Sequence, residues 1–147
     1  MNIFITGFSN GLGHEITRLL LEKDHIVYGI SRYPGNIFKE NNNFIGKSCD
    51  IRIEKDIEDI IYDQKKIGFV PDVVILNAGS HIKENKNFSW KNYFDIFQTN
   101  CFGSIKWIEW YLPIFIEKKS GHFVHISSLS AIFPFPYRAS YSGSKAY

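Results

Sequence analysis

A tyrosine and a lysine near the end of the sequence have a spacing that suits proton transfer. Tyr141 and Lys145 are four residues apart, so on a helix they lie one turn apart on the same face. A free tyrosine has a pKa of about 10 and is a poor base at neutral pH, but a nearby ammonium group favours the phenolate. Such a pair can exchange a proton with a carbonyl or hydroxyl oxygen. The Y-x-x-x-K pattern alone is weak, so its surroundings decide its meaning.

Two serines precede this pair, directly after an apolar run that predicts a strand over residues 123–126. Ligands of parallel α/β sheets bind at the carboxyl ends of the strands. Ser128 lies thirteen positions before Tyr141, and its hydroxyl could hold a substrate oxygen. Ser127 is the rival candidate. Capping or turn formation at the strand end is the alternative role for such a serine.

A glycine-rich segment near the start of the sequence is typical of a loop that holds phosphate. It lies between a predicted strand and a predicted helix, where a dinucleotide pyrophosphate rests on the helix N-terminus. Glycine permits the unusual backbone angles of such a turn and a close approach of the phosphates. The spacing, T-G-x-x-x-G-x-G, differs from the common G-x-G-x-x-G fingerprint, and a plain turn is the alternative interpretation. The candidate cofactor-binding residues of this loop are Gly7, Ser9, Asn10, Gly11, Leu12 and Gly13.

The end of the second predicted strand indicates which dinucleotide is bound. A carboxylate there would bind the ribose 2′-hydroxyl of NAD, whereas a nearby arginine suits the 2′-phosphate of NADP. The strand ends in Ser31 and Arg32, with no carboxylate, and a guanidinium matches phosphate oxygens in a bidentate way. The sequence therefore favours NADP(H), with NAD(H) possible. The alternative role of Arg32 is that of a solvated surface arginine.

The elements that must position these residues alternate along the chain. Short apolar runs and amphipathic stretches follow one another, as in an α/β domain with a parallel sheet. We predict strands over 2–6, 25–30, 44–47, 72–76 and 123–126, and helices over 11–23, 53–66, 90–118 and from about 140 onwards. The expected fold is one Rossmann-like, doubly wound domain over 1–147. It is truncated after about five strands, because this fold ordinarily has at least six.

Composition excludes several other classes of protein. The 147 residues are 44% hydrophobic and 22% charged, with a net charge of +2, which predicts a globular domain without a nucleic-acid or membrane-surface partner. No apolar stretch approaches the roughly 20 residues of a membrane span, and no signal peptide is evident. Cys49 and Cys101 are expected to be buried thiols in a reducing cytoplasm. The five histidines show no ligand-like grouping, so no metal site is predicted.

Taken in order, these motifs resemble the short-chain dehydrogenase/reductase family over the entire length of the chain. Besides the glycine loop, Ser128, Tyr141 and Lys145, the landmarks of the resemblance are Asp50 and Ile51 after the third strand, Asn77, Ala78 and Gly79 after the fourth, and Asn100 in the long helix. The resemblance implies hydride transfer between a nicotinamide cofactor and a carbonyl compound or secondary alcohol.

The resemblance also implies a role for each of these residues. Tyr141 would be the acid/base, Lys145 would hold the nicotinamide ribose and tune Tyr141, and Ser128 would polarise the substrate carbonyl. Asn100 would support a water-linked proton path to Lys145. Asp50 and Ile51 would flank the adenine, while Asn77, Ala78 and Gly79 would stabilise the central sheet and line the cofactor cleft. Two alternatives stay open, because Asn100 could be a helix-interior residue with a local partner and Asp50 could cap the helix starting near Ile53.

Two further expectations concern assembly and completeness. Trp107, Trp110 and Tyr111 lie at helical spacing, and the resemblance implies a homo-oligomer through this helix; a buried core is the alternative. The sequence stops two residues after Lys145, where the family continues with its substrate-binding part. The chain is therefore interpreted as a fragment of an NADP-dependent reductase, with a truncated, inactive nucleotide binder or a non-catalytic regulator as alternatives.

Overall fold

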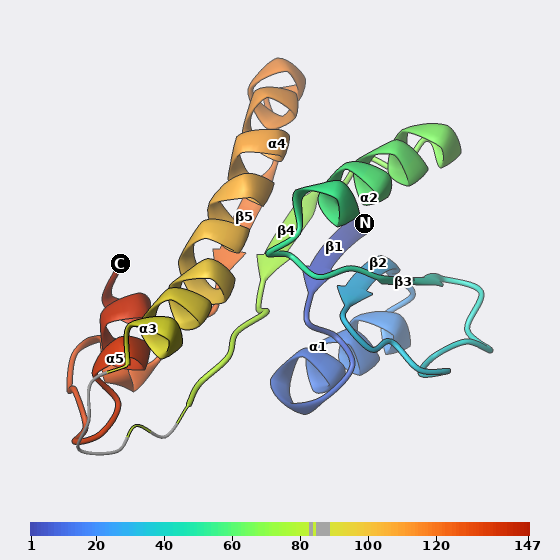
Figure 1. The fold of residues 1–147 in the computed structure, drawn as a ribbon. Coiled ribbons are helices and arrows are strands. Elements are labelled where there is room, and N and C mark those ends of the chain that lie inside the picture. Colours follow the sequence, from blue (N-terminus) through green and yellow to red (C-terminus); the bar gives the residue numbers. More distant parts are fainter. Residues whose placement is uncertain (83, 85–88) are drawn as a thin grey trace.

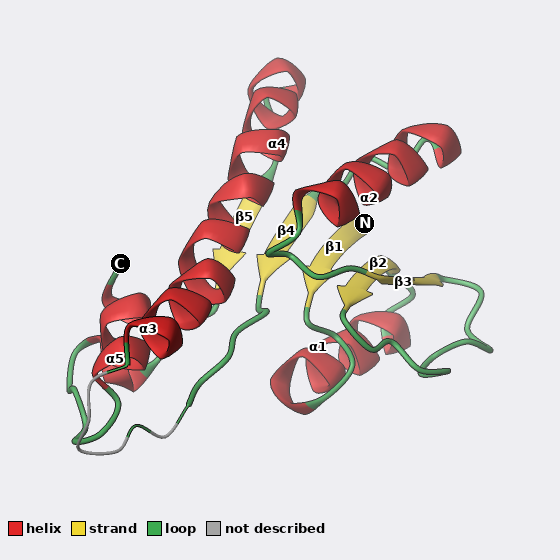
Figure 2. Cartoon of the chain, in the orientation of Figure 1, coloured by secondary structure: helices red, strands yellow, loops and turns green. Residues whose placement is uncertain are grey.

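A parallel β-sheet forms the centre of the computed structural model, which describes residues 1–82, 84 and 89–147. Within these residues the sheet has five strands in the order β3-β2-β1-β4-β5 (Figure 2). The strand order reverses between β1 and β4, which is the topology predicted for a doubly wound, Rossmann-like sheet. The strands are β1 (Asn2–Thr6), β2 (Ile26–Ser31), β3 (Phe44–Ser48), β4 (Val73–Leu76) and β5 (His122–His125).

Helices cover both faces of this sheet (Figure 1). Helix α1 (Gly11–Glu22) lies on one face, and α2 (Glu54–Ile67) and α4 (Gly103–Lys118) lie on the other. Successive residues of a strand point to opposite faces. In β1, accordingly, Ile3 and Ile5 pack into the α1 layer, whereas Phe4 packs with Trp107 and Tyr111 of α4. The apolar runs of β1, β2 and β4 are thus strands buried on both faces, whereas the edge strands β3 and β5 are partly exposed.

The aromatic stripe of the long helix belongs to this core. Trp107 and Tyr111 are 0% and 1% exposed, and their rings lie 4.6 and 5.3 Å from the ring of Phe4. The expected dimer face near Trp107 and Trp110 is therefore wrong for Trp107, whose side chain is enclosed by its own chain. Trp110 is half-buried, with the Lys65 ammonium 4.6 Å from its ring centroid. A homo-oligomer through this helix near Trp110 stays a prediction.

The predicted helix over 90–118 is helical throughout but not uniform. It consists of α3 (Trp90–Phe97), a π-helical turn from Gln98 to Phe102 (η1), and α4. Such turns occur mostly as short segments within α-helices, often at functional sites. The spacing of the hydrophobic residues did not predict this π-helical turn.

The chain after β5 forms a short 3₁₀ turn, Leu129–Ala131 (η2), and then helix α5 (Ala139–Ala146). Helix α5 packs against α3 and against the 3₁₀ turn, and Figure 1 shows α3 and α5 side by side. The structure therefore brings together segments from the middle and the end of the chain. Across the described residues, no helix is both long and apolar enough to cross a membrane.

Candidate active site

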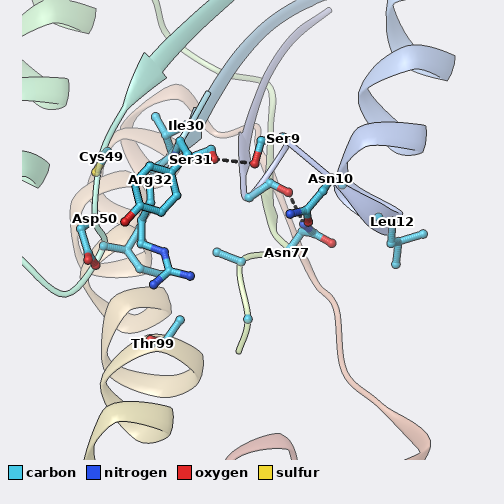
Figure 3. Close-up of a pocket in the computed structure, with 17 residues that line it drawn as sticks. Ser9, Asn10, Leu12, Ile30, Ser31, Arg32, Cys49, Asp50, Asn77 and Thr99 are labelled. Carbon is cyan, nitrogen blue, oxygen red and sulfur yellow. Dashed lines mark hydrogen bonds between the residues drawn. The ribbon is translucent and has the colours of Figure 1, made fainter. Parts of the chain in front are cut away.

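A cleft of about 310 Å³ lies at the carboxyl ends of β1 to β4, where the strand order reverses (Figure 3). It gathers every predicted cofactor-binding residue except Tyr141 and Lys145. From the sequence-based prediction, its lining contains Gly7, Ser9, Asn10, Gly11, Leu12, Gly13, Arg32, Asp50, Ile51, Asn77, Ala78 and Gly79. The prediction missed Ile30, Ser31, Tyr33, Cys49 and Thr99, which complete the lining. Four of these residues could have been predicted, because they lie at or next to the ends of β2 and β3: Ile30, Ser31, Tyr33 and Cys49.

The glycine loop brings the start of α1 into direct contact with the end of β1. Gly7 and Gly11 have φ angles of +76° and +54°, a region that L-residues with side chains seldom adopt. Gly13 is required for a different reason. A Cβ at this position would lie 2.0 Å from the carbonyl oxygen of Gly7 and 2.4 Å from Nδ2 of Asn77. The backbone itself therefore forms this wall of the cleft.

The ends of β1 and β4 are fixed to each other by hydrogen bonds between Thr6 and Asn77. The buried Thr6 hydroxyl accepts from the backbone N–H groups of Asn77 and Ala78, at 3.1 and 2.9 Å. The Asn77 side chain donates to the carbonyl oxygens of Thr6 and Gly7, at 3.1 and 2.9 Å. Asn77 thus joins β4 to the end of β1 and also holds Gly7 of the glycine loop.

The ends of β2 and β3 form the opposite wall of the cleft. Ser31 donates a hydrogen bond to the Ser9 hydroxyl at 2.7 Å, and Figure 3 shows the Arg32 side chain on the same side of the cleft as Asp50 and Thr99. Arg32 is exposed at the rim. A cationic group therefore flanks the cleft just past the end of β2.

Asp50 is paired with Arg52, which stabilises the charged form of its carboxyl group. Its carboxylate accepts two hydrogen bonds from the Arg52 guanidinium, at 2.9 and 2.6 Å, which outweigh partial burial and lower the pKa of Asp50; the Arg32 charge acts in the same direction. The alternative role as a cap of α2 is not observed, because the N-cap of that helix is Ile53, with no side-chain cap.

The lysine of the Y-x-x-x-K pattern lies next to Gly79, a residue of the cleft lining. Its Nζ donates to the carbonyl oxygen of Ile126, just past β5, at 2.8 Å. A Cβ built on Gly79, which lines the cleft, would lie 3.5 Å from both Lys145 Nζ and Asn100 Oδ1. Burial lowers the pKa of Lys145 below its ordinary value, while the Cys101 thiol acts in the opposite direction.

Asn100 lies in the π-helical turn and joins two distant segments. Its buried amide accepts from the Ser80 N–H at 2.8 Å and donates to the Ser80 carbonyl at 3.0 Å. It also donates to the Ser144 hydroxyl of α5 at 2.8 Å, and that hydroxyl donates to the Tyr141 carbonyl. The side chain of Asn100 thus bonds to Ser80 and Ser144, which are remote in sequence, contrary to the alternative of a local helix partner. Its role in a proton path stays a prediction.

The two candidate serines differ in how their hydroxyls are used. Ser127 Oγ donates to the carbonyl oxygen of Lys145 at 3.3 Å. Ser128 Oγ instead accepts from the Ser130 N–H at 3.2 Å, as the N-cap of the 3₁₀ turn. Helix α5, which carries the half-buried Tyr141 and Lys145, packs against this turn. The structure thus brings Ser128, Asn100, Tyr141 and Lys145 into one region, and in the described part of the chain no cluster of potential metal ligands occurs.

The arrangement fits a bound dinucleotide. At the N-terminus of α1, Asn10 forms no side-chain cap, so the N–H groups of the first turn remain available to an anionic group. The glycines of the loop leave backbone rather than side chains facing the cleft. Arg32 adds a positive charge at the rim.

Comparison with known proteins identifies the family of this chain. A profile of the short chain dehydrogenase family matches residues 1–147. The 3-ketodihydrosphingosine reductase of Bacteroides thetaiotaomicron is 33% identical over 145 residues, covering 97% of this chain and 52% of that protein. The NADPH-dependent pterin aldehyde reductase of Arabidopsis thaliana is 25% identical, covering 86% and 55%. The chain spans about half the length of these curated relatives.

Among solved structures, a mutant 4-hydroxyisoleucine dehydrogenase complexed with NADH and succinate superposes with a TM-score of 0.93. Its sequence is 22% identical, and the alignment covers 99% of this chain and 62% of that one. This likeness concerns the fold alone. Since the family profile covers the whole sequence, the chain belongs to the short-chain dehydrogenase family.

Proposed function

We propose that the protein is an NADP(H)-dependent oxidoreductase that interconverts a carbonyl compound and a secondary alcohol. Residues 1–147 would form its nucleotide-binding domain, in a cytoplasmic setting where the buried Cys49 and Cys101 stay free. The observation that carries the proposal is that Lys145 and Asn100 lie next to Gly79 in the cleft lining. A Cβ placed on Gly79 would lie 3.5 Å from Lys145 Nζ and 3.5 Å from Asn100 Oδ1. This proximity links the helix that carries Tyr141 to the cleft that would hold the cofactor.

The residues around α5 would manage the substrate oxygen and its proton. The cofactor, when bound, supplies or accepts the hydride. Tyr141 would donate a proton to the carbonyl oxygen during reduction and remove it from the alcohol during oxidation. Lys145 would hold the nicotinamide ribose and stabilise the Tyr141 phenolate electrostatically. Its half-buried ammonium suits this role, because charge interactions strengthen where water is excluded.

Ser128 is the better candidate for binding the substrate oxygen. Its hydroxyl accepts its hydrogen bond from Ser130, so its own proton is free to be donated. The hydroxyl of Ser127 is already used as a donor to Lys145. We therefore assign to Ser128 the hydrogen bond that polarises the carbonyl, and to Asn100 the support of a water-linked path to Lys145.

The other half of the cleft would hold the rest of the cofactor. The N-terminus of α1 and its glycines would hold the pyrophosphate, and Asp50 and Ile51 would flank the adenine. The preference for NADP(H) rests on Arg32 at the cleft rim and on the lack of a carboxylate at the end of β2. One relative is named as NADPH-dependent, while a structural neighbour carries NADH.

Replacing Arg32 by alanine should test this preference. A charge-assisted hydrogen bond contributes about 1.5–3 kcal/mol, so we expect the Kd for NADPH to rise about 10- to 100-fold and the Kd for NADH to change by less than about three-fold. Fluorescence titration of both cofactors measures this. Arg18→Ala, which removes a partly exposed arginine paired with Glu15 and Glu22 on α1, is the matched control. Equal losses for both cofactors would contradict the role of Arg32.

The reaction itself is tested by NADPH oxidation with a panel of aldehydes and ketones, using the complete protein that contains this chain. We expect turnover of at least one carbonyl compound, because Tyr141 and Ser128 would provide hydroxyl groups that can donate to a carbonyl oxygen. Cofactor binding without turnover of any carbonyl would leave a nucleotide-binding or regulatory protein on the same scaffold.

A further inference from the structure

The carboxylate of Glu84, in the segment after β4, binds the first turn of α5. Its Oε2 accepts from the Ala139 N–H at 3.0 Å, and its Oε1 accepts from the Ser140 N–H at 2.7 Å and from the Ser140 hydroxyl. In return, the Glu84 N–H donates to the carbonyl oxygen of Tyr137 at 3.0 Å. Four hydrogen bonds thus join this one residue to the start of α5.

Helix α5 has no cap from its own sequence. Its N-cap residue, Arg138, forms no side-chain cap hydrogen bond, although the first N–H groups of a helix need external partners. Glu84, 55 positions before Ala139, supplies them. Its negative charge also lies at the positive end of the helix dipole. Partial burial opposes ionisation, but the bonds from Ser140 and Ala139 prevail and lower the pKa of Glu84.

The far end of α5 is held by a second contact, which leaves the tyrosine between two anchors. Asn100, bonded to the backbone of Ser80, donates to Ser144. Between the two anchors, the ring of His81 meets the ring of Tyr141 edge to face, at 6.0 Å between centroids. Three residues after Gly79 are thus linked to α5. Glu84 binds the start of the helix, His81 contacts Tyr141, and Ser80 is linked to the end of the helix through Asn100.

We propose that Glu84 is a positioning residue, whose carboxylate fixes the first turn of α5 and thereby sets the location of Tyr141 relative to the cofactor cleft. The inference rests on the proposed function, because it gives Tyr141 the acid/base role. Glu84 acts through the helix and does not touch the reacting atoms. Its effect should fall mainly on the chemical step, because Lys145, which would hold the cofactor, lies at the other end of α5, where Asn100 holds Ser144.

The test compares Glu84→Ala and Glu84→Gln with Glu58→Gln, an exposed carboxylate on α2, in the complete protein. Small displacements of catalytic groups can cost up to about 100-fold in rate, so we expect kcat of Glu84→Ala to fall about 10- to 100-fold. The Kd for NADPH should stay within about two-fold, because the phosphate-binding loop is untouched and the end of α5 that carries Lys145 keeps its bonds from Asn100 to Ser144 and from Lys145 to Ile126. Glu84→Gln keeps one acceptor oxygen and should recover part of the loss, and Glu58→Gln should match the wild type.

The proposal is overturned if the folded Glu84 variants keep kcat within about two-fold of the wild type. It is also overturned if the melting temperature, NADPH affinity and kcat fall together, since Glu84 would then serve general stability. If Glu84→Ala does not fold, the nearly isosteric Glu84→Gln decides by the same criteria. A wild-type protein that turns over no carbonyl would contradict the proposed function instead. Amide exchange at Ala139 and Ser140 would then still report whether Glu84 holds α5.

Discussion

Replacing Tyr141 by phenylalanine should lower kcat for carbonyl reduction by about 10²- to 10⁴-fold, the range that general acid–base catalysis contributes. The variant removes the phenolic hydroxyl and keeps the half-buried ring, so its edge-to-face contact with His81 should persist. The backbone contact from Ser144 to the Tyr141 carbonyl is also untouched. Cofactor affinity and the melting temperature should therefore stay close to those of the wild type.

Steady-state kinetics with NADPH and one turned-over carbonyl compound measure this effect. Tyr62→Phe is the matched control, because Tyr62 is 71% exposed on α2, away from the cleft. It should leave kcat unchanged. A Tyr141→Phe protein that retains more than about a tenth of the wild-type kcat would exclude Tyr141 as the acid/base. It would leave the cofactor site as predicted.

Gly13→Ala should destabilise the fold and remove most cofactor binding. The new methyl group would meet the Gly7 carbonyl oxygen at 2.0 Å and the Asn77 amide at 2.4 Å. Neither can move cheaply, because Asn77 is bonded to both Thr6 and Gly7. Overpacking of this kind typically costs up to about 3 kcal/mol, and we expect the free energy of unfolding to fall by about that amount. Since the displaced loop lines the cleft, the Kd for NADPH should rise at least about tenfold, which corresponds to about 1.4 kcal/mol.

The neighbouring Gly11 provides the control for stability. A Cβ at this position meets no atom within 4 Å, although its φ is +54°. Asparagine tolerates this left-handed conformation better than other residues with a side chain, so Gly11→Asn should lower the free energy of unfolding by no more than about 1 kcal/mol. Urea denaturation of the two variants compares them directly. If both lose the same stability, the close approach of α1 to Gly7 is not what requires glycine at position 13.

Several features could be predicted because their signals are local in the sequence. The apolar runs predicted every strand found among the described residues to within a residue or two at either end, since a buried parallel strand needs apolar side chains on both faces. The glycine loop, Arg32 and Asn77 were found because each directly follows such a strand. Strand ends of a parallel sheet meet at one edge, so the sequence also predicted that these residues line one cleft.

Other features depend on contacts between residues that are distant in sequence, and local sequence patterns cannot predict such contacts. The spacing of Trp107 fits a dimer face and a core equally well, and only packing against Phe4 decides for the core. The different hydrogen bonds of Ser127 and Ser128 follow from where α5 and the 3₁₀ turn come to lie. The π-helical turn at Asn100 brings the amide of that residue between Ser80 and Ser144.

By itself, the sequence determined the family, the order of strands and helices, and the residues at the strand ends, because these follow from periodicity and from motifs within short stretches of chain. Only the tertiary structure decided how α5 is held. The cap of that helix is Glu84, which no capping pattern within α5 could indicate, because a carboxylate can satisfy a helix end from any position that the fold brings near.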